Sequence, residues 1–184
     1  HRSRYTGQCV VMMIKTEQEK MNGYEEIGSA DIASGLDFAL DQILRVLPDF
    51  TESFQPAYSV NNFYEPSENT DWTNGFWTGQ IWLAYEYIKR THPEYTVDID
   101  RLYHAGTVQV QSFLERIRKK ISVDHHDMGF LYSPSCVAAY KLTGNNDARS
   151  AAVLAADQLL TRFQTVGGFL QAWGPMDQKD NYRL

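Results

Sequence analysis

The sequence predicts an all-α fold built from stacked helical hairpins. Apolar residues recur at spacings of three and four in five stretches, the period of an amphipathic helix, and only GFLQAW (168–173) approaches the alternation of a strand. Two segments resemble each other, LAYEYIKRTHPEYTVDIDRLYHAG and AAYKLTGNNDARSAAVLAADQL, with Tyr85 and Tyr140 in corresponding positions. Each such unit is a helix, a polar turn and a second helix, which cannot bury its apolar face alone and therefore stacks on its neighbours.

Stacked hairpins of this kind can close into a ring, the α/α toroid. A ring of six hairpins at this period would need about 330 residues, and the 184 residues hold little more than three hairpins. We therefore predict that residues 29–184 form the N-terminal half of a single toroid domain, and that residues 1–28 are a leader. The apolar patch VVMMI in the leader is too short for a signal peptide, and we expect residues 1–11 to be vector-derived, with Met12 or Met13 as the natural start.

Each predicted helix is recognised by its apolar stripe. The first begins after Ser29 as a possible cap and ends at Pro48, the segment 51–72 is irregular, and Gly167 and Gly168 close the fifth. We expect the fourth to start at Ser133, because proline is tolerated only in the first turn of an α-helix. In chain order, the stripes are Ile32, Leu36, Leu40, Ile43, Leu44 and Leu47; Trp77, Ile81, Ala84, Tyr85 and Ile88; Leu102, Val110, Phe113, Leu114, Ile117 and Ile121; a run from Phe130 to Leu142; and Ala152, Ala155, Leu159 and Phe163.

Composition and charge exclude several classes of protein. The formal net charge of −6 argues against nucleic-acid binding, because no basic stripe is present to replace phosphate counterions. The basic cluster 116–120 is interpreted as the solvated end of a helix, where cations suit the helix dipole. No apolar run is long enough to cross a membrane.

The cysteines and two of the four tryptophans have structural interpretations. Cys9 and Cys136 are too few for a disulfide framework, which predicts a reducing, cytoplasmic environment. Cys136 lies in an apolar helical pattern and is expected to be an inert thiol. Trp77 and Trp82 lie at helical spacing and are interpreted as core anchors.

Three segments between helices mix tryptophan, glycine and polar residues: DWTNGFWTG (71–79), DHHDMGF (124–130) and GGFLQAWGP (167–175). Alternate loops of a toroid gather at one end of the ring, so a shared cleft is expected there. Trp72 and Trp173 are assigned to this cleft as faces on which sugar rings stack, and glycine is expected to let the backbone approach a ligand.

The stretch Asp124-His125-His126-Asp127 has three interpretations. A catalytic metal is disfavoured, because adjacent histidines usually point apart and metal ligands must converge. An aspartate at this position suits a helix cap, but a cap needs one acid and leaves the histidines unexplained. The third interpretation places Asp127, beside His126, in a partly dry cleft where a carboxylate can act on a sugar.

At these segments the sequence resembles the unsaturated glucuronyl hydrolases, glycoside hydrolase family 88. The matching stretches are NTDWTNGFWTGQIWLAYEY, DHHDMGFLYSPSCVAAYKLTG, GGFLQAWGP and the tail NYRL, and the resemblance runs from about residue 30 to the end. It implies an (α/α)6 barrel without a cofactor or metal. It also implies removal of a C4=C5 unsaturated uronic acid from the non-reducing end of oligosaccharides that lyases produce, such as those from glycosaminoglycans, by hydration of the vinyl ether.

The resemblance also implies roles for particular residues. Asp127 matches one of two essential aspartates, His126 and Trp72 match substrate contacts, and Trp173 matches a stacking tryptophan. The second aspartate, the general acid and base, follows a segment that matches NYRL, so we expect it beyond these 184 residues and expect this piece alone to be inactive. Asp177 and Asp180 precede that segment and are not assigned the role.

Three alternatives stay open at this point. An unsaturated rhamnogalacturonyl hydrolase is a related barrel that acts on pectin fragments. A non-catalytic carbohydrate-binding helical domain would keep the tryptophans but would not need Asp127. A metal-dependent hydrolase would use His125 and His126. The sequence does not indicate an oligomeric state, and an oligosaccharide is the expected partner.

Overall fold

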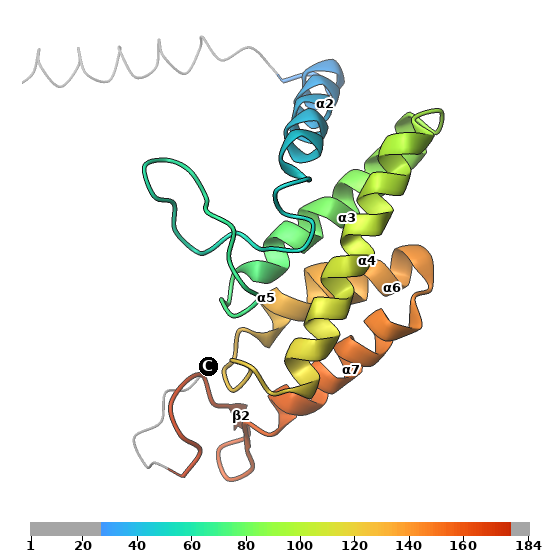
Figure 1. Ribbon diagram of the computed structural model, residues 1–184. Helices are drawn as coiled ribbons and strands as arrows, with labels where there is room; N and C mark the ends of the chain where they lie inside the picture. Colours follow the sequence, from blue (N-terminus) through green and yellow to red (C-terminus); the bar gives the residue numbers. More distant parts are fainter. Residues whose placement is uncertain (1–26, 178–184) are drawn as a thin grey trace, which may run out of the picture. The chain divides into compact units, whose positions relative to one another are not determined.

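The computed structural model describes residues 27–177 (Figure 1). The chain divides into two compact units, His1–Phe38 and Ala39–Leu184, and helix α2 (Ser29–Val46) begins in the first and ends in the second. Most of the expected leader, Cys9 and the tail NYRL lie outside the described residues. Between residues 27 and 177, no helix is both long and apolar enough to span a membrane.

The second unit is built from two helical hairpins, and the all-α prediction is confirmed. The elements are α3 (Asn74–Thr91), α4 (Thr96–Arg118), α5 (Met128–Tyr132), the π-helical turn η1 (Ser133–Val137), α6 (Ala138–Thr143), α7 (Asn146–Leu160), β1 (Phe163–Gln164) and β2 (Phe169–Leu170). The first hairpin pairs α3 with α4, the second pairs the α5–η1–α6 run with α7, and α4 packs against both α3 and α7 (Figure 1). The strand expected at GFLQAW is two residues long and pairs with β1 in an antiparallel hairpin.

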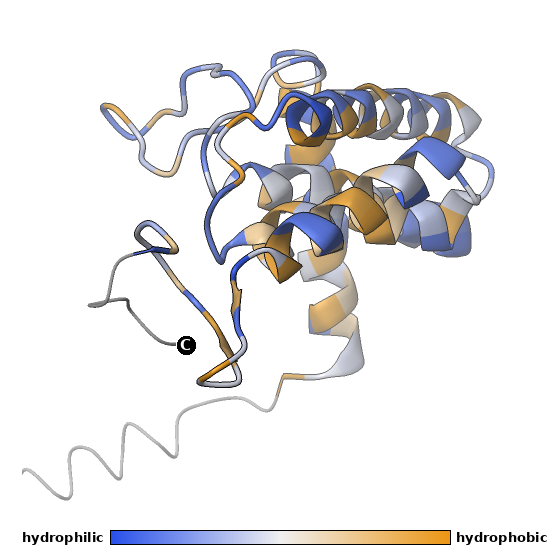
Figure 2. Ribbon diagram, turned by 90° about the horizontal axis from the view of Figure 1, so that it is seen from below, coloured by the Kyte–Doolittle hydropathy of each residue, from blue (hydrophilic) through white to orange (hydrophobic). Residues whose placement is uncertain are grey.

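The core lies where the apolar stripes of these helices meet. Figure 2 shows hydrophobic and hydrophilic residues alternating around the helices, as expected for amphipathic elements that bury one face,. Trp77 and Trp82 are both buried, which confirms them as core residues. The indole N–H of Trp77 donates a 2.9 Å hydrogen bond to the carbonyl of Phe50, which ties the turn before the irregular segment to α3.

The fourth helix starts earlier than predicted, and Pro134 lies inside it. Helical structure begins at Met128 and continues through η1 into α6, so the expected start at Ser133 is wrong. The π-helical turn accommodates the proline, since its wider register releases carbonyls that an α-helix would pair. The hydroxyl of Ser135 donates to the carbonyl of Leu131, four residues earlier.

Two glycines of α3 allow this irregular helix to approach closely. A Cβ on Gly75 would lie 2.1 Å from the carbonyl oxygen of Phe130, and a Cβ on Gly79 would lie 2.7 Å from Cβ of Pro134. The two glycines are four residues apart and therefore share one face of α3. They serve helix packing, which corrects the expectation that glycine here lets the backbone approach a ligand.

Two other predicted helix ends also differ. Helix α4 stops at Arg118, before Ile121, and α7 stops at Leu160, before Phe163, which belongs to β1. Both residues keep the apolar spacing of their helices but lie in the connections that follow. These connections carry the residues of the candidate site.

Candidate functional site

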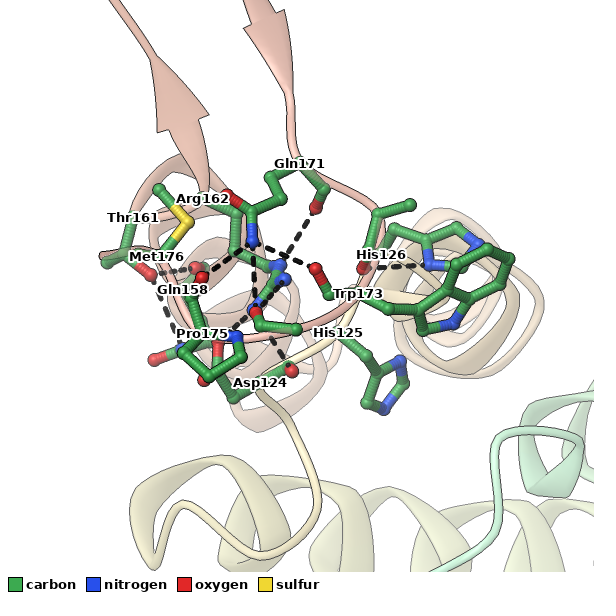
Figure 3. A network of polar contacts seen from close by, with 12 residues as sticks. Asp124, His125, His126, Gln158, Thr161, Arg162, Gln171, Trp173, Pro175 and Met176 are labelled. Carbon is green, nitrogen blue, oxygen red and sulfur yellow. Dashed lines mark hydrogen bonds and ion pairs between the residues drawn. The ribbon is translucent and has the colours of Figure 1, made fainter. Parts of the chain in front are cut away.

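His126 is held between Asp127 and the loop that carries Trp173. Its Nδ1 lies 3.0 Å from the carbonyl oxygen of Ala172, and its Nε2 lies 3.2 Å from Oδ1 of Asp127. The imidazole also meets the indole of Trp173 edge-on, with ring centroids 4.4 Å apart (Figure 3). Three of the four predicted site residues are therefore in one group.

The contacts of His126 fix the orientation of its ring. A backbone carbonyl can only accept, so Nδ1 carries the hydrogen that bonds to Ala172,. Nε2 then faces the carboxylate of Asp127 at 3.2 Å. The side chain of Asp127 is only 16% exposed, so this pair lies at the edge of solvent rather than in it.

His125 plays a different part, because both of its ring nitrogens are taken by backbone groups. The N–H of Asp127 donates to Nδ1 at 3.1 Å, and Nε2 lies 2.9 Å from the carbonyl oxygen of Ser122. Since Nδ1 accepts this hydrogen bond, its 3.5 Å contact with Oδ2 of Asp127 is not an ion pair. Within residues 27–177, no three histidine, cysteine or acidic residues are grouped so as to hold a metal ion.

Neither aspartate of the loop caps a helix. Asp127 occupies the N-cap position of α5, but its carboxylate makes no capping hydrogen bond. The carboxylate of Asp124 instead lies 2.5 Å from Nη1 of the buried Arg162. The capping interpretation is therefore wrong, and the carboxylate of Asp127 stays available beside His126.

Trp72 lies in a neighbouring aromatic cluster with Phe76 and Phe130. Its ring centroid is 6.4 Å from that of Phe76 and 6.0 Å from that of Phe130, and its side chain is 45% exposed. The backbone N–H of Phe130 donates to the carbonyl of Asp127 at 2.9 Å, which joins the cluster to the loop. The two phenylalanines were missed as site residues although both lie inside the quoted motifs.

Two buried arginines were also missed. Arg162 is 1% exposed and bonds to the Asp124 loop and to the Trp173 loop. Arg116 is equally buried, so its assignment to a solvated helix end was wrong; burial lowers its pKa from the ordinary value. Nothing in the sequence signals burial at either position, because an arginine near a helix C-terminus usually points to solvent.

Comparison with known proteins identifies relatives along most of the chain, although no family model matches it. The unsaturated chondroitin disaccharide hydrolase of Streptococcus pneumoniae is 44% identical over 160 residues, which cover 87% of this chain and 37% of that protein. The crystal structure of an unsaturated glucuronyl hydrolase from Streptococcus agalactiae superposes with a TM-score of 0.70 at 42% identity, over 81% of this chain and 36% of that one. The chain is homologous to the unsaturated glucuronyl hydrolases.

The chain matches only part of the length of these hydrolases. It spans little more than a third of the curated relatives' length, and its hairpins superpose on part of their α/α barrel, which confirms the predicted fold class. A variant of the S. agalactiae unsaturated glucuronyl hydrolase has been solved with dGlcA-GalNAc6S. That structure is 37% identical, with a TM-score of 0.68, over 79% of this chain and 36% of that one.

Proposed function

We propose that the chain belongs to a hydrolase that removes a C4=C5 unsaturated uronic acid from the non-reducing end of lyase-generated glycosaminoglycan oligosaccharides. The observation that carries the proposal is the carboxylate of Asp127, which is largely shielded from solvent and contacts His126 at 3.2 Å rather than a helix N-terminus. The relatives support the substrate class, since they are named for unsaturated chondroitin disaccharides or for the glucuronyl group.

The proposed reaction is hydration of a vinyl ether. A proton adds to C4, and water adds to C5 and loses a proton. The resulting hemiketal opens to a C5 ketone and a C1 hemiacetal, and collapse of the hemiacetal to the aldehyde releases the sugar from the anomeric carbon. Positive charge develops at C5 and the ring oxygen when C4 is protonated, and a negative side chain at that point lowers the barrier. We assign this role to Asp127, with His126 in contact with its carboxylate.

The tryptophans are proposed as binding surfaces. The indole of Trp173 is 53% exposed beside His126, and that of Trp72 is half-exposed in the aromatic cluster. An exposed, rigid ring offers an apolar face to the C–H groups of a sugar with little loss of conformational freedom. We expect a second carboxylate, the proton donor, from outside residues 27–177.

The test uses Asp127→Asn in the intact protein, meaning these 184 residues with any sequence that naturally flanks them. The loss of the conjugated C4=C5 absorbance reports hydrolysis of an unsaturated chondroitin disaccharide, and titration calorimetry reports its binding. We expect turnover to fall at least about 10²-fold while binding changes little, because the amide is isosteric but uncharged. Full turnover in the variant would refute the catalytic role.

The same assay separates the alternatives. A non-catalytic carbohydrate-binding domain would bind the disaccharide without loss of absorbance in the wild type. An unsaturated rhamnogalacturonyl hydrolase would prefer a pectin-derived disaccharide over the chondroitin one, and a metal-dependent hydrolase would lose activity on chelation.

We also propose a cytoplasmic site of action and a single catalytic domain that includes residues 29–184. Cys136 is a free, fully buried thiol, which is typical of a reducing compartment,. The oligosaccharide is the expected partner. Fractionation of cells that express the intact protein, with immunodetection, tests its location.

A further inference from the structure

We infer that Arg116 and Arg162 are positioning residues, which hold the Asp127 loop between the two segments that carry Trp72 and Trp173. This inference rests on the proposed function, because it assigns the two arginines a role in the same site. Each guanidinium joins one end of the segment 121–124, which directly precedes His125, His126 and Asp127, to one tryptophan-bearing loop.

Arg162 joins the Asp124 end of the segment to the Trp173 loop. The guanidinium donates from Nη1 to the carbonyl of Asp124 at 3.1 Å and to its carboxylate at 2.5 Å. It donates from Nε to the carbonyl of Gln171 at 2.9 Å and from Nη2 to that of Gly174 at 3.0 Å, so its bonds enclose Trp173 on both sides (Figure 3).

The side chain of Gln171 completes this arrangement. It is fully buried, and its Nε2 lies within 3.0 Å of the carbonyl oxygens of Trp173, Gly174 and Pro175. The side-chain oxygen Oε1 of Gln171 accepts a hydrogen bond from Nε2 of Gln164 at 2.7 Å. Two buried polar side chains therefore fix the backbone on which Trp173 and the Ala172 acceptor of His126 are placed.

Arg116 acts in the same way at the other end of the segment. Its Nε and Nη2 donate to the carbonyls of Ile121 and Ser122, at 3.2 and 2.8 Å. Three further bonds reach the stretch immediately before Trp72. They go to Oδ1 of Asn69 at 2.9 Å, the carbonyl of Asp71 at 3.0 Å and the carbonyl of Thr70 at 3.2 Å.

The contacts of Arg116 favour positioning over a general contribution to stability. All five hydrogen bonds of Arg116 go to neutral oxygens, and burial of a charge without an ion pair opposes folding. A planar guanidinium with five donors can hold several carbonyls in a fixed mutual geometry, and an ammonium cannot. The placement of both arginines at the joints between loops, rather than between helices, indicates that the loops need this geometry.

The experiment compares Arg162→Lys and Arg116→Lys in the intact protein labelled with 5-fluorotryptophan. Trp173→Phe and Trp72→Phe assign the fluorine resonances. Arg149→Lys and Arg118→Lys, which alter exposed arginines of α7 and α4, are the controls. We expect Arg162→Lys to shift or broaden the Trp173 resonance and Arg116→Lys that of Trp72. In both variants, the fluorine resonances of the core residues Trp77 and Trp82 should be unchanged.

The kinetic expectation is a fall in kcat of about 10- to 100-fold with KM within about threefold, because misplacement of a reacting group affects the chemical step more than binding. Equal shifts at Trp77 and Trp82, or activity lost only in proportion to unfolded protein, would show a structural role and overturn the inference. If Arg116→Lys fails to fold, Asn69→Ala, which removes the side-chain acceptor of Arg116, replaces it, and an unmoved Trp72 resonance with unchanged kcat would refute the role of Arg116. If Arg162→Lys fails to fold, Asp124→Ala replaces it, since that side chain is exposed. Asp124→Ala should shift the Trp173 resonance in the same direction as Arg162→Lys but by a smaller amount. An unshifted Trp173 resonance together with an unchanged kcat would refute the role of Arg162.

The two proposals fail separately. A wild-type protein that does not hydrolyse any unsaturated disaccharide contradicts the proposed function. The fluorine spectra still decide whether each arginine controls its own tryptophan.

Discussion

His126 bridges Asp127 and the carbonyl of Ala172 through its two ring nitrogens, at 3.2 and 3.0 Å. The two contacts can be separated by amide substitutions. The nitrogen of asparagine reaches the place of Nδ1, and that of glutamine reaches the place of Nε2. Comparing the activities of the two variants therefore shows which of the two contacts the site needs.

We expect His126→Asn to lose more activity than His126→Gln. Asparagine keeps the bond to Ala172 but leaves Asp127 without its partner, whereas glutamine keeps a donor on the carboxylate. Removal of one partner from a largely buried polar contact corresponds to about 1–3 kcal/mol, or roughly 5- to 150-fold in kcat/KM. Steady-state hydrolysis of an unsaturated disaccharide measures the difference, and the reverse order would mean that the anchor to Ala172 matters more.

The aromatic residues should divide between binding and positioning. Trp72→Ala removes a half-exposed ring of the aromatic cluster, and we expect KM to rise about 10-fold with little change in kcat, as for a uniform binding contact. Trp173→Ala also removes the ring against His126, so both parameters should change. Leu160→Ala, an exposed apolar residue of α7, is the control that should leave both parameters unchanged.

The sequence predicted the helices and the site loops because both depend on local patterns. Apolar spacing located α3, α4 and α7, and the mixture of tryptophan, histidine and acid marked the loops. The grouping of His126, Asp127 and Trp173 needed only the topological rule that alternate loops of stacked hairpins gather at one end.

What could not be predicted depends on contacts between distant segments. The burial of Arg162 is decided by carbonyls of Asp124, Gln171 and Gly174, and a sequence pattern carries no information about where free carbonyls converge. The position of Pro134 inside a helix likewise depends on the small face that Gly75 and Gly79 present. Proline rules for an isolated α-helix could not foresee the π-helical turn.

The close approach of α3 to η1 predicts a steric effect at Gly79. Gly79→Ala places a methyl group 2.7 Å from Cβ of the rigid Pro134 ring, and we expect the free energy of unfolding to fall by about 1–3 kcal/mol, as for an overpacked core. Gly129→Ala is the matched control, because its Cβ would meet no atom within 4 Å and alanine favours a helix. Urea denaturation measures the stability of both variants. Equal denaturation midpoints for Gly79→Ala and Gly129→Ala would contradict the close packing of α3 against η1.

Cys136 should resist modification while the protein is folded. Its side chain is fully buried, and burial raises the pKa of the thiol to about 12, so almost no thiolate is present near neutral pH. In a Cys9→Ser background, iodoacetamide at pH 8 should leave the native protein unmodified and alkylate it in urea. Rapid alkylation of the native protein, measured by intact mass, would contradict the buried assignment.

Stability should decline in alkaline solution for the same reason. Burial raises the pKa of Cys136 from its ordinary value near 9 to about 12, and raises that of Tyr132 above its ordinary value near 10. The folded protein keeps these protons over a range in which the unfolded chain releases them, so their contribution is full below about pH 9 and is lost as the pH rises toward the folded pKa. Each group contributes a slope of up to about 1.4 kcal/mol per pH unit. Urea denaturation between pH 8 and 11 should show this decline, and Tyr132→Phe should flatten it above pH 10 whereas the exposed Tyr140→Phe should not; identical slopes in the two variants would mean that Tyr132 is not protected by burial.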